Sequence, residues 1–185
     1  MKKTLISKEF IISAGKEIVT ESGIQALNMR DIAQRCDISV GSVYNYFPSK
    51  EDLGIAIIES IWTEIIHNSK EYHSTLGFTE NILFLFKNIQ KGSKRYPSFF
   101  RVHPMTLSNM DKNKGREVMH RYFGHMKNGL IKSLDQDPNV REDVFSDKFT
   151  KVKFVDFVFS NILTLLMKEE SCDYLVEIVK CIIYD

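Results

Sequence analysis

Apolar positions recur along the chain at helical spacing, and no run alternates between apolar and polar residues as a strand would. After Pro48, for example, Leu53, Ile57, Ile61 and Ile65 follow one another at four-residue steps. Residues three or four apart lie on the same face of a helix. The sequence therefore predicts an all-helical fold.

Helix start and stop signals divide the chain at Pro48. Before it we expect three short helices: one from an N-cap at Ser7 to Ser22, ended by Gly23, a second over about 29–36 capped by Asn28, and a third within 39–47. After it, the capping-box-like Ser49-Lys50-Glu51-Asp52 opens a long linking helix, about 49–72. The predicted domains are residues 1–48 and residues 49–185, the second a helical bundle.

Further helices of the bundle follow from the same periodicity and from clusters of turn-forming residues. We expect helices at about 79–94, 97–107, 115–134, 148–169 and 172–184. The loops between them are predicted at 74–77, 111–115 and 135–139.

Residues 29–47 contain the residue types that a helix-turn-helix requires. This motif joins two short helices at a steep angle, so a small residue is needed where the helices approach. Ala33 is that residue, and Asp37 lies in the turn, where it tolerates a positive φ better than most residues. The apolar positions that lock the pair are Ile32, Cys36, Ile38, Val43 and Tyr46 or Phe47.

The second helix of this motif has the surface of a DNA-reading element. Ser39 can cap it and leave its first amides facing a phosphate. Its outward residues are small or form hydrogen bonds and include no acid, as a major-groove surface requires: Val40, Gly41, Ser42, Tyr44 and Asn45. The alternative is an ordinary surface helix with two exposed tyrosines, which would need all these spacings to coincide by accident.

Residues 7–60 resemble the DNA-binding domain of the tetracycline-repressor-like (TetR) family, in the segments 29–33, 41–47 and 49–53. Asp37 departs from the glycine that is common in that turn. The resemblance implies a homodimer, in most cases a repressor, that a small molecule in the C-terminal domain releases from DNA. It assigns base or adjacent backbone contacts to Val40, Gly41, Ser42, Tyr44 and Asn45, phosphate contacts to Asn28, Ser39, Tyr46 and Lys50, and either role to Arg30.

Charge adds little to the prediction of DNA binding. The formal net charge is +1, and residues 1–50 hold seven Lys and Arg against five Asp and Glu. Each subunit would therefore make few phosphate contacts, and affinity would depend on a dimer that occupies two half-sites of double-stranded operator DNA.

The segment 148–168 is apolar on nearly every face, and the last helix carries a second apolar stripe. A bundle of this size can bury one side of such a helix, so we expect the other side to pack against a second copy of the chain, giving a four-helix dimer interface. The alternative is a central core helix in a monomer. The predicted interface residues are Phe154, Val158, Ile162, Leu166, Leu175, Ile178 and Ile182.

Aromatic residues and methionines between these two regions suggest a cavity for a small apolar or aromatic effector. The chain has thirteen Phe, seven Tyr and one Trp, and such side chains with a few polar groups are the usual lining of a small-molecule site. Simple core packing is the alternative for each of them. The predicted ligand-binding residues are Trp62, Phe84, Tyr96, Phe99, Phe100, His103, Met119, Tyr122, Phe123 and Met126.

Other function classes find no support. The histidine pairs His120–His125 and His67–His73 lack the spacing of three or four residues that one helix face needs for a metal site, and no nucleophile elbow or phosphate loop occurs. We therefore expect no enzyme, no metal and no cofactor. Three cysteines without a paired spacing, no signal peptide and no membrane-length apolar run predict a cytoplasmic protein that does not bind membranes.

The favoured function is a ligand-responsive repressor of transcription. A regulator of the same fold that activates transcription, or that needs a corepressor, remains an alternative. A helical-bundle enzyme or metal-binding protein is the alternative from another class, but it requires a polar constellation that the sequence lacks.

Overall fold

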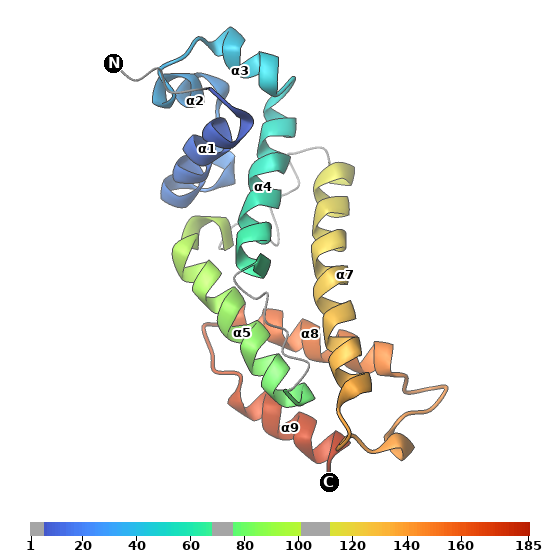
Figure 1. Cartoon of the computed structure of the whole chain (residues 1–185). Coiled ribbons are helices and arrows are strands. Elements are labelled where there is room, and N and C mark those ends of the chain that lie inside the picture. The colour runs from blue at the N-terminus through green and yellow to red at the C-terminus, as the bar shows by residue number, and fades with distance from the viewer. Residues whose placement is uncertain (1–5, 68–75, 101–111) are drawn as a thin grey trace. The chain divides into compact units, whose positions relative to one another are not determined.

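The computed structural model describes residues 6–67, 76–100 and 112–185, and only the backbone of 66–67 and 112–116. Every regular element in these ranges is a helix, which confirms the predicted fold class (Figure 1). The elements are α1 (Lys8–Ser22), η1 (Ile24–Ala26), α2 (Met29–Arg35), α3 (Val40–Tyr46), α4 (Lys50–His67), α5 (Phe78–Arg95), α7 (Lys112–Gln136), η3 (Glu142–Val144), α8 (Lys151–Met167) and α9 (Asp173–Ile183). None of these helices is long and apolar enough to cross a membrane.

The chain forms two compact units. The N-terminal unit consists of Met1–Glu64 and Ser93–Met119, and the C-terminal unit of Ile65–Gly92 and His120–Asp185. The helices α4, α5 and α7 each contribute residues to both units. The domain boundary at residue 48, which was inferred from the proline, stays a prediction.

Local capping signals placed the helix starts correctly. Ser7 Oγ accepts a hydrogen bond from Phe10 N at 3.2 Å and caps α1. Ser49 Oγ accepts from Asp52 N at 3.0 Å and donates to Asp52 Oδ2 at 2.8 Å, so it caps α4. Gly23 ends α1 with a φ of 82°, which favours glycine.

The observed helices differ from one predicted loop and agree with part of one predicted helix. The predicted loop 111–115 was wrong over 112–115, because α7 already begins at Lys112. Polar residues such as lysine have good helix propensity, so a stretch without apolar residues can still be helical. Residues 97–100 are helical as predicted, whereas 101–107, 68–72 and 74–75 lie outside the described residues.

A buried carboxylate joins three helix ends in the C-terminal unit. Asp137 Oδ2 accepts hydrogen bonds from Phe78 N at 2.7 Å and from Tyr184 Oη at 2.5 Å, and Oδ1 accepts from Asn139 N at 3.0 Å. Phe78 is the first residue of α5, so the carboxylate also caps that helix, where a negative charge is favourable. One side chain after α7 thus fixes the start of α5 and the residue after α9.

Asp137 should contribute stability that depends on pH. Burial alone would raise its pKa, but the hydrogen bonds from Tyr184, Phe78 and Asn139 outweigh burial and lower the pKa below 3.8. We expect Asp137→Ala to reduce the free energy of unfolding by about 2–4 kcal/mol at pH 7, because it leaves buried donors unpaired.

Urea unfolding measures this loss, with Tyr184→Phe as a milder variant that removes one donor only. Because the pKa of Asp137 is lower in the folded state than in the unfolded state, its charge stabilises the fold at pH values above the unfolded-state pKa. This contribution is lost as the pH falls through the folded-state pKa. The difference between wild type and Asp137→Ala should therefore shrink below about pH 4. A difference that is independent of pH would contradict the proposed role of the charge.

Candidate nucleic-acid interface

The helices α2 and α3 form the predicted helix-turn-helix around a small apolar core. Ile32, Ala33 and Val43 are at most 2% exposed. Asp37 has a φ of 53°, as expected for the turn, and Ile38 N donates to Ala33 O at 3.0 Å. The sequence offered Tyr46 or Phe47 as the last apolar position that locks the two helices. Phe47 is buried, whereas Tyr46 is half-buried.

The residues predicted to contact bases lie together on the outward side of α3. Ser39 caps the helix by accepting from Ser42 N at 3.0 Å. Gly41, Tyr44 and Asn45 are exposed, and Val40 and Ser42 are half-buried. The α3 surface, defined as residues 39–42, 44 and 45, thus presents hydroxyl, amide and phenol groups and no charge.

The other residues predicted to contact phosphates lie at the start of α2, at the end of α3 and at the start of α4. Asn28 caps α2 by accepting from Arg30 N at 2.8 Å, and both side chains are exposed, as is Lys50. The Tyr46 hydroxyl donates to Ile6 O at 3.0 Å, which joins α3 to the residue before the cap of α1. No local pattern in the sequence indicates this contact, because forty residues separate the two groups.

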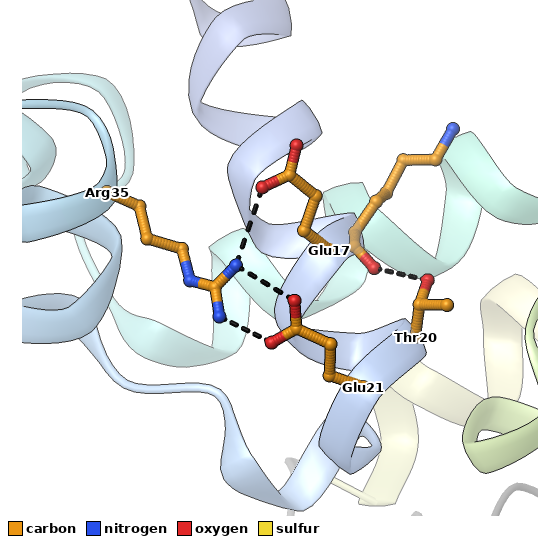
Figure 2. A network of polar contacts seen from close by, with 5 residues as sticks. Glu17, Thr20, Glu21 and Arg35 are labelled. Carbon is orange, nitrogen blue, oxygen red and sulfur yellow. Dashed lines mark hydrogen bonds and ion pairs between the residues drawn. The ribbon is translucent and has the colours of Figure 1, made fainter.

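An ion-pair network that the sequence analysis did not identify positions α2 against α1 (Figure 2). Arg35 pairs with Glu21 through two nitrogens, at 3.2 and 2.5 Å, and with Glu17 at 3.4 Å. The hydrogen bond from Arg35 lowers the pKa of Glu21. Glu17 and Glu21 are four residues apart on α1, a spacing that could have indicated a shared cationic partner.

Sequence comparison identifies this region. The family described as "Bacterial regulatory proteins, tetR family" matches residues 11–57, which contain α2 and α3. Residues 11–57 of this chain are a TetR-family N-terminal domain.

Curated relatives of this chain are regulators of transcription by name. The repressor KstR of Mycolicibacterium smegmatis is 25% identical over 87% of this chain and 77% of its own length. The dhaKLM operon activator DhaS of Lactococcus lactis is 27% identical over 54% of this chain. The match spans only about half of DhaS, 52%. These names support the exclusion of an enzyme.

Solved structures show the same fold over most of the chain. Reduced NemR from Escherichia coli has a TM-score of 0.68 at 15% identity, over 95% of this chain and 96% of its own. FadR from Bacillus subtilis, solved in complex with stearoyl-CoA, has a TM-score of 0.64 at 18% identity, over 88% and 89% of the two chains.

The predicted ligand-binding residues fall in both compact units. The N-terminal unit holds Trp62, Tyr96, Phe99, Phe100 and Met119, and the C-terminal unit holds Phe84, Tyr122, Phe123 and Met126. His103 lies outside the described residues. In the N-terminal unit the rings of Trp62, Phe99 and Phe100 meet edge to face, with centroids 5.4–6.3 Å apart. The assignment of these residues to an effector stays a prediction.

Glu64 connects α1 to the residues around the end of α5 within the N-terminal unit. Its carboxylate accepts from Lys16 Nζ at 2.6 Å and from Tyr96 Oη at 2.8 Å, and it also pairs with Arg95. Burial alone would raise the pKa of Glu64, but these partners lower it. Lys16 and Glu64 are 48 residues apart, so the sequence pattern carried no signal of this pair.

The structure changes which apolar residues are available for a partner. Phe154, Val158, Ile162 and Leu175 were predicted at the interface but are at most 1% exposed within their own chain. Leu166 and Ile182 are half-buried, and Ile178 is 44% exposed. The sequence could not separate the two sides of α8, because both are apolar. The exposed α8–α9 face consists of Val152, Phe157, Met167, Tyr174 and Ile178.

The described residues contain no group of three or more His, Cys, Asp or Glu side chains placed to hold a metal ion. All three cysteines are free, with Cys36 and Cys172 buried and Cys181 exposed. Burial raises the pKa of the Cys172 thiol to about 11.

The turn of the helix-turn-helix should be sensitive to the residue type at 37. A β-branched side chain is strained at a φ of 53°, so we expect Asp37→Val to lower the free energy of unfolding by about 1–2 kcal/mol. Asp37→Gly should change it by less than about 0.5 kcal/mol, because the relief of strain offsets the greater entropy of the unfolded chain. Chemical denaturation compares the two variants, and an equal loss in both would show that the Asp37 side chain, not its φ, is required.

Proposed function

We propose that this TetR-family chain is a homodimeric repressor of transcription, which binds operator DNA through α3 and is released by a small apolar ligand. The observation that best supports DNA binding is the α3 surface, which is uncharged and carries hydrogen-bonding groups. A capped helix-turn-helix exposes this surface to solvent. Gly41 supports a close approach of DNA: a side chain there would have its nearest neighbour, Ser39 Oγ, at 3.8 Å. The fold itself therefore has room for a larger residue, whereas a nearby DNA backbone favours glycine.

Dimerisation is supported by the α8–α9 face. Its five side chains are 44–64% exposed, although all are large and apolar or aromatic. Exposed residues of this kind on two adjacent helices mark an interaction site. A second copy that presents the same face would bury them in a symmetric four-helix contact.

Ligand control is supported by the aromatic residues of both units and by solved relatives. FadR of Bacillus subtilis is described in complex with stearoyl-CoA, and the multidrug binding protein EbrR in complex with imidazole. The α3 surfaces of the two subunits must lie about 34–36 Å apart to enter successive major grooves. A ligand that prefers another separation shifts the population away from the DNA-bound state by its differential affinity.

Activation is the second candidate, because DhaS is named as an activator whereas KstR is named as a repressor. Selection of bound DNA from a random pool gives the operator. Transcription from a promoter that carries it, with and without the protein, decides between repression and activation. Failure to select any sequence would contradict the proposed function.

Base and phosphate contacts should respond differently to substitution. We expect Tyr44→Ala and Asn45→Ala each to weaken operator binding by about 1–3 kcal/mol with little effect on random DNA. Lys50→Ala should weaken binding to both DNAs and make the negative slope of log affinity against log salt shallower by about one. Fluorescence anisotropy at several salt concentrations measures all three variants. If Asn45→Ala weakens operator and random DNA equally, Asn45 is not a base contact.

The proposed interface predicts a change in oligomeric state. Sedimentation of the wild type should give about twice the 21.5 kDa chain mass. Ile178→Glu should shift the protein to monomer at micromolar concentration, because it places an unpaired charge in an apolar contact. Lys132→Glu, an exposed position on α7, is the control and should remain dimeric. A wild type that sediments as a monomer would contradict the proposed dimer.

A further inference from the structure

Two asparagines lie on the buried stripe of α5 in the C-terminal unit. Asn81 is 1% exposed and Asn88 is 9% exposed. They are seven residues apart, on the side of the helix that also carries the buried Phe78, Leu85 and Gly92. An uncharged amide on such a stripe needs a reason, because burial removes its hydrogen bonds to water.

Asn81 has a structural reason for its position. Its Nδ2 lies 2.7 Å from Ser133 Oγ on α7 and 3.1 Å from both Leu76 O and Gly77 O. The amide thus joins the start of α5 to α7, close to the Asp137 carboxylate that caps α5. Only its Oδ1 is buried without a hydrogen-bond partner.

Asn88 has no such reason. Its Nδ2 is buried and has no hydrogen-bond partner among the described residues. Buried donors in proteins are almost always paired, and an unpaired one calls for a partner from outside the chain. Leucine has a similar size and a better helix propensity, so packing and helix formation alone would not select asparagine here.

We infer that Asn88 Nδ2 is the hydrogen-bond donor to the effector, which therefore carries an acceptor oxygen on an otherwise apolar body. Ketones, esters, thioesters and carboxylates have this chemistry, whereas a plain hydrocarbon does not. Asn88 is then a specificity-determining residue: it binds the acceptor, and the surrounding apolar side chains bind the rest. The inference rests on the proposed ligand control and narrows the class of ligand.

The protein without ligand gives the first test. Asn88→Leu removes an unpaired donor, so its melting temperature should equal or exceed that of the wild type. Asn81→Leu removes the contacts to Ser133 and to two carbonyls, so it should melt several degrees lower. Asn128→Leu, an exposed position on α7, controls for the substitution itself. If Asn88→Leu is destabilised as much as Asn81→Leu, Asn88 has a structural partner and the inference is wrong.

The second test uses ligands of nearly equal shape. Hexanophenone and hexylbenzene differ in whether a carbonyl oxygen is present, and methyl decanoate supplies the same acceptor on an acyl chain. For the full-length wild type we expect the ketone and the ester to release the selected operator at concentrations about tenfold lower than hexylbenzene does. In Asn88→Leu hexanophenone and hexylbenzene should act at similar concentrations, because the donor that distinguishes them is gone.

The outcomes separate the two proposals. If wild type and Asn88→Leu share the same preference for the carbonyl ligands, or neither has one, the role of Asn88 is wrong but ligand control stands. If no ligand binds the wild type or releases the operator, ligand control by apolar molecules is contradicted, and the role of Asn88 with it.

Discussion

The α3 surface depends on the packing between two helices of seven residues each, α2 and α3. Helices this short are not stable in isolation, so tertiary contacts must hold them. Ile32, Ala33 and Val43 supply those contacts, Asp37 makes the turn, and Asn28 and Ser39 satisfy the first amides of each helix. Because the same few contacts set the crossing angle, they also set the direction in which the α3 surface faces.

Features that depend on near neighbours in the chain could be predicted from the sequence. Caps at Ser7, Asn28, Ser39 and Ser49, and the positive φ at Asp37, each involve groups within five residues. Contacts between distant segments could not be predicted. The Glu64 network and the bond from Tyr46 to Ile6 join residues 31 to 48 positions apart, and no periodicity encodes such a distance.

The same limit applies to the α8–α9 face. Phe154 and Phe157 are the same residue type on the same helix, yet Phe154 is 0% exposed and Phe157 is 48% exposed. Apolar periodicity identifies a buried stripe only where the opposite side is polar. When both sides are apolar, the pattern predicts that two surfaces are covered but not which residue belongs to which surface. The three-dimensional packing of one chain is needed to separate them.

The ion pairs of the N-terminal unit explain why control by a ligand is physically reasonable. Residues 1–50 contain seven Lys and Arg, but Arg35 pairs with Glu17 and Glu21, and Lys16 pairs with Glu64. Fewer cations remain for phosphates, and non-specific attraction to DNA depends on their number. In the proposed dimer, affinity then comes mainly from two half-sites occupied together. A modest change in the separation of the two α3 surfaces prevents one of them from reaching its half-site. A ligand therefore needs only a small differential affinity to release the protein.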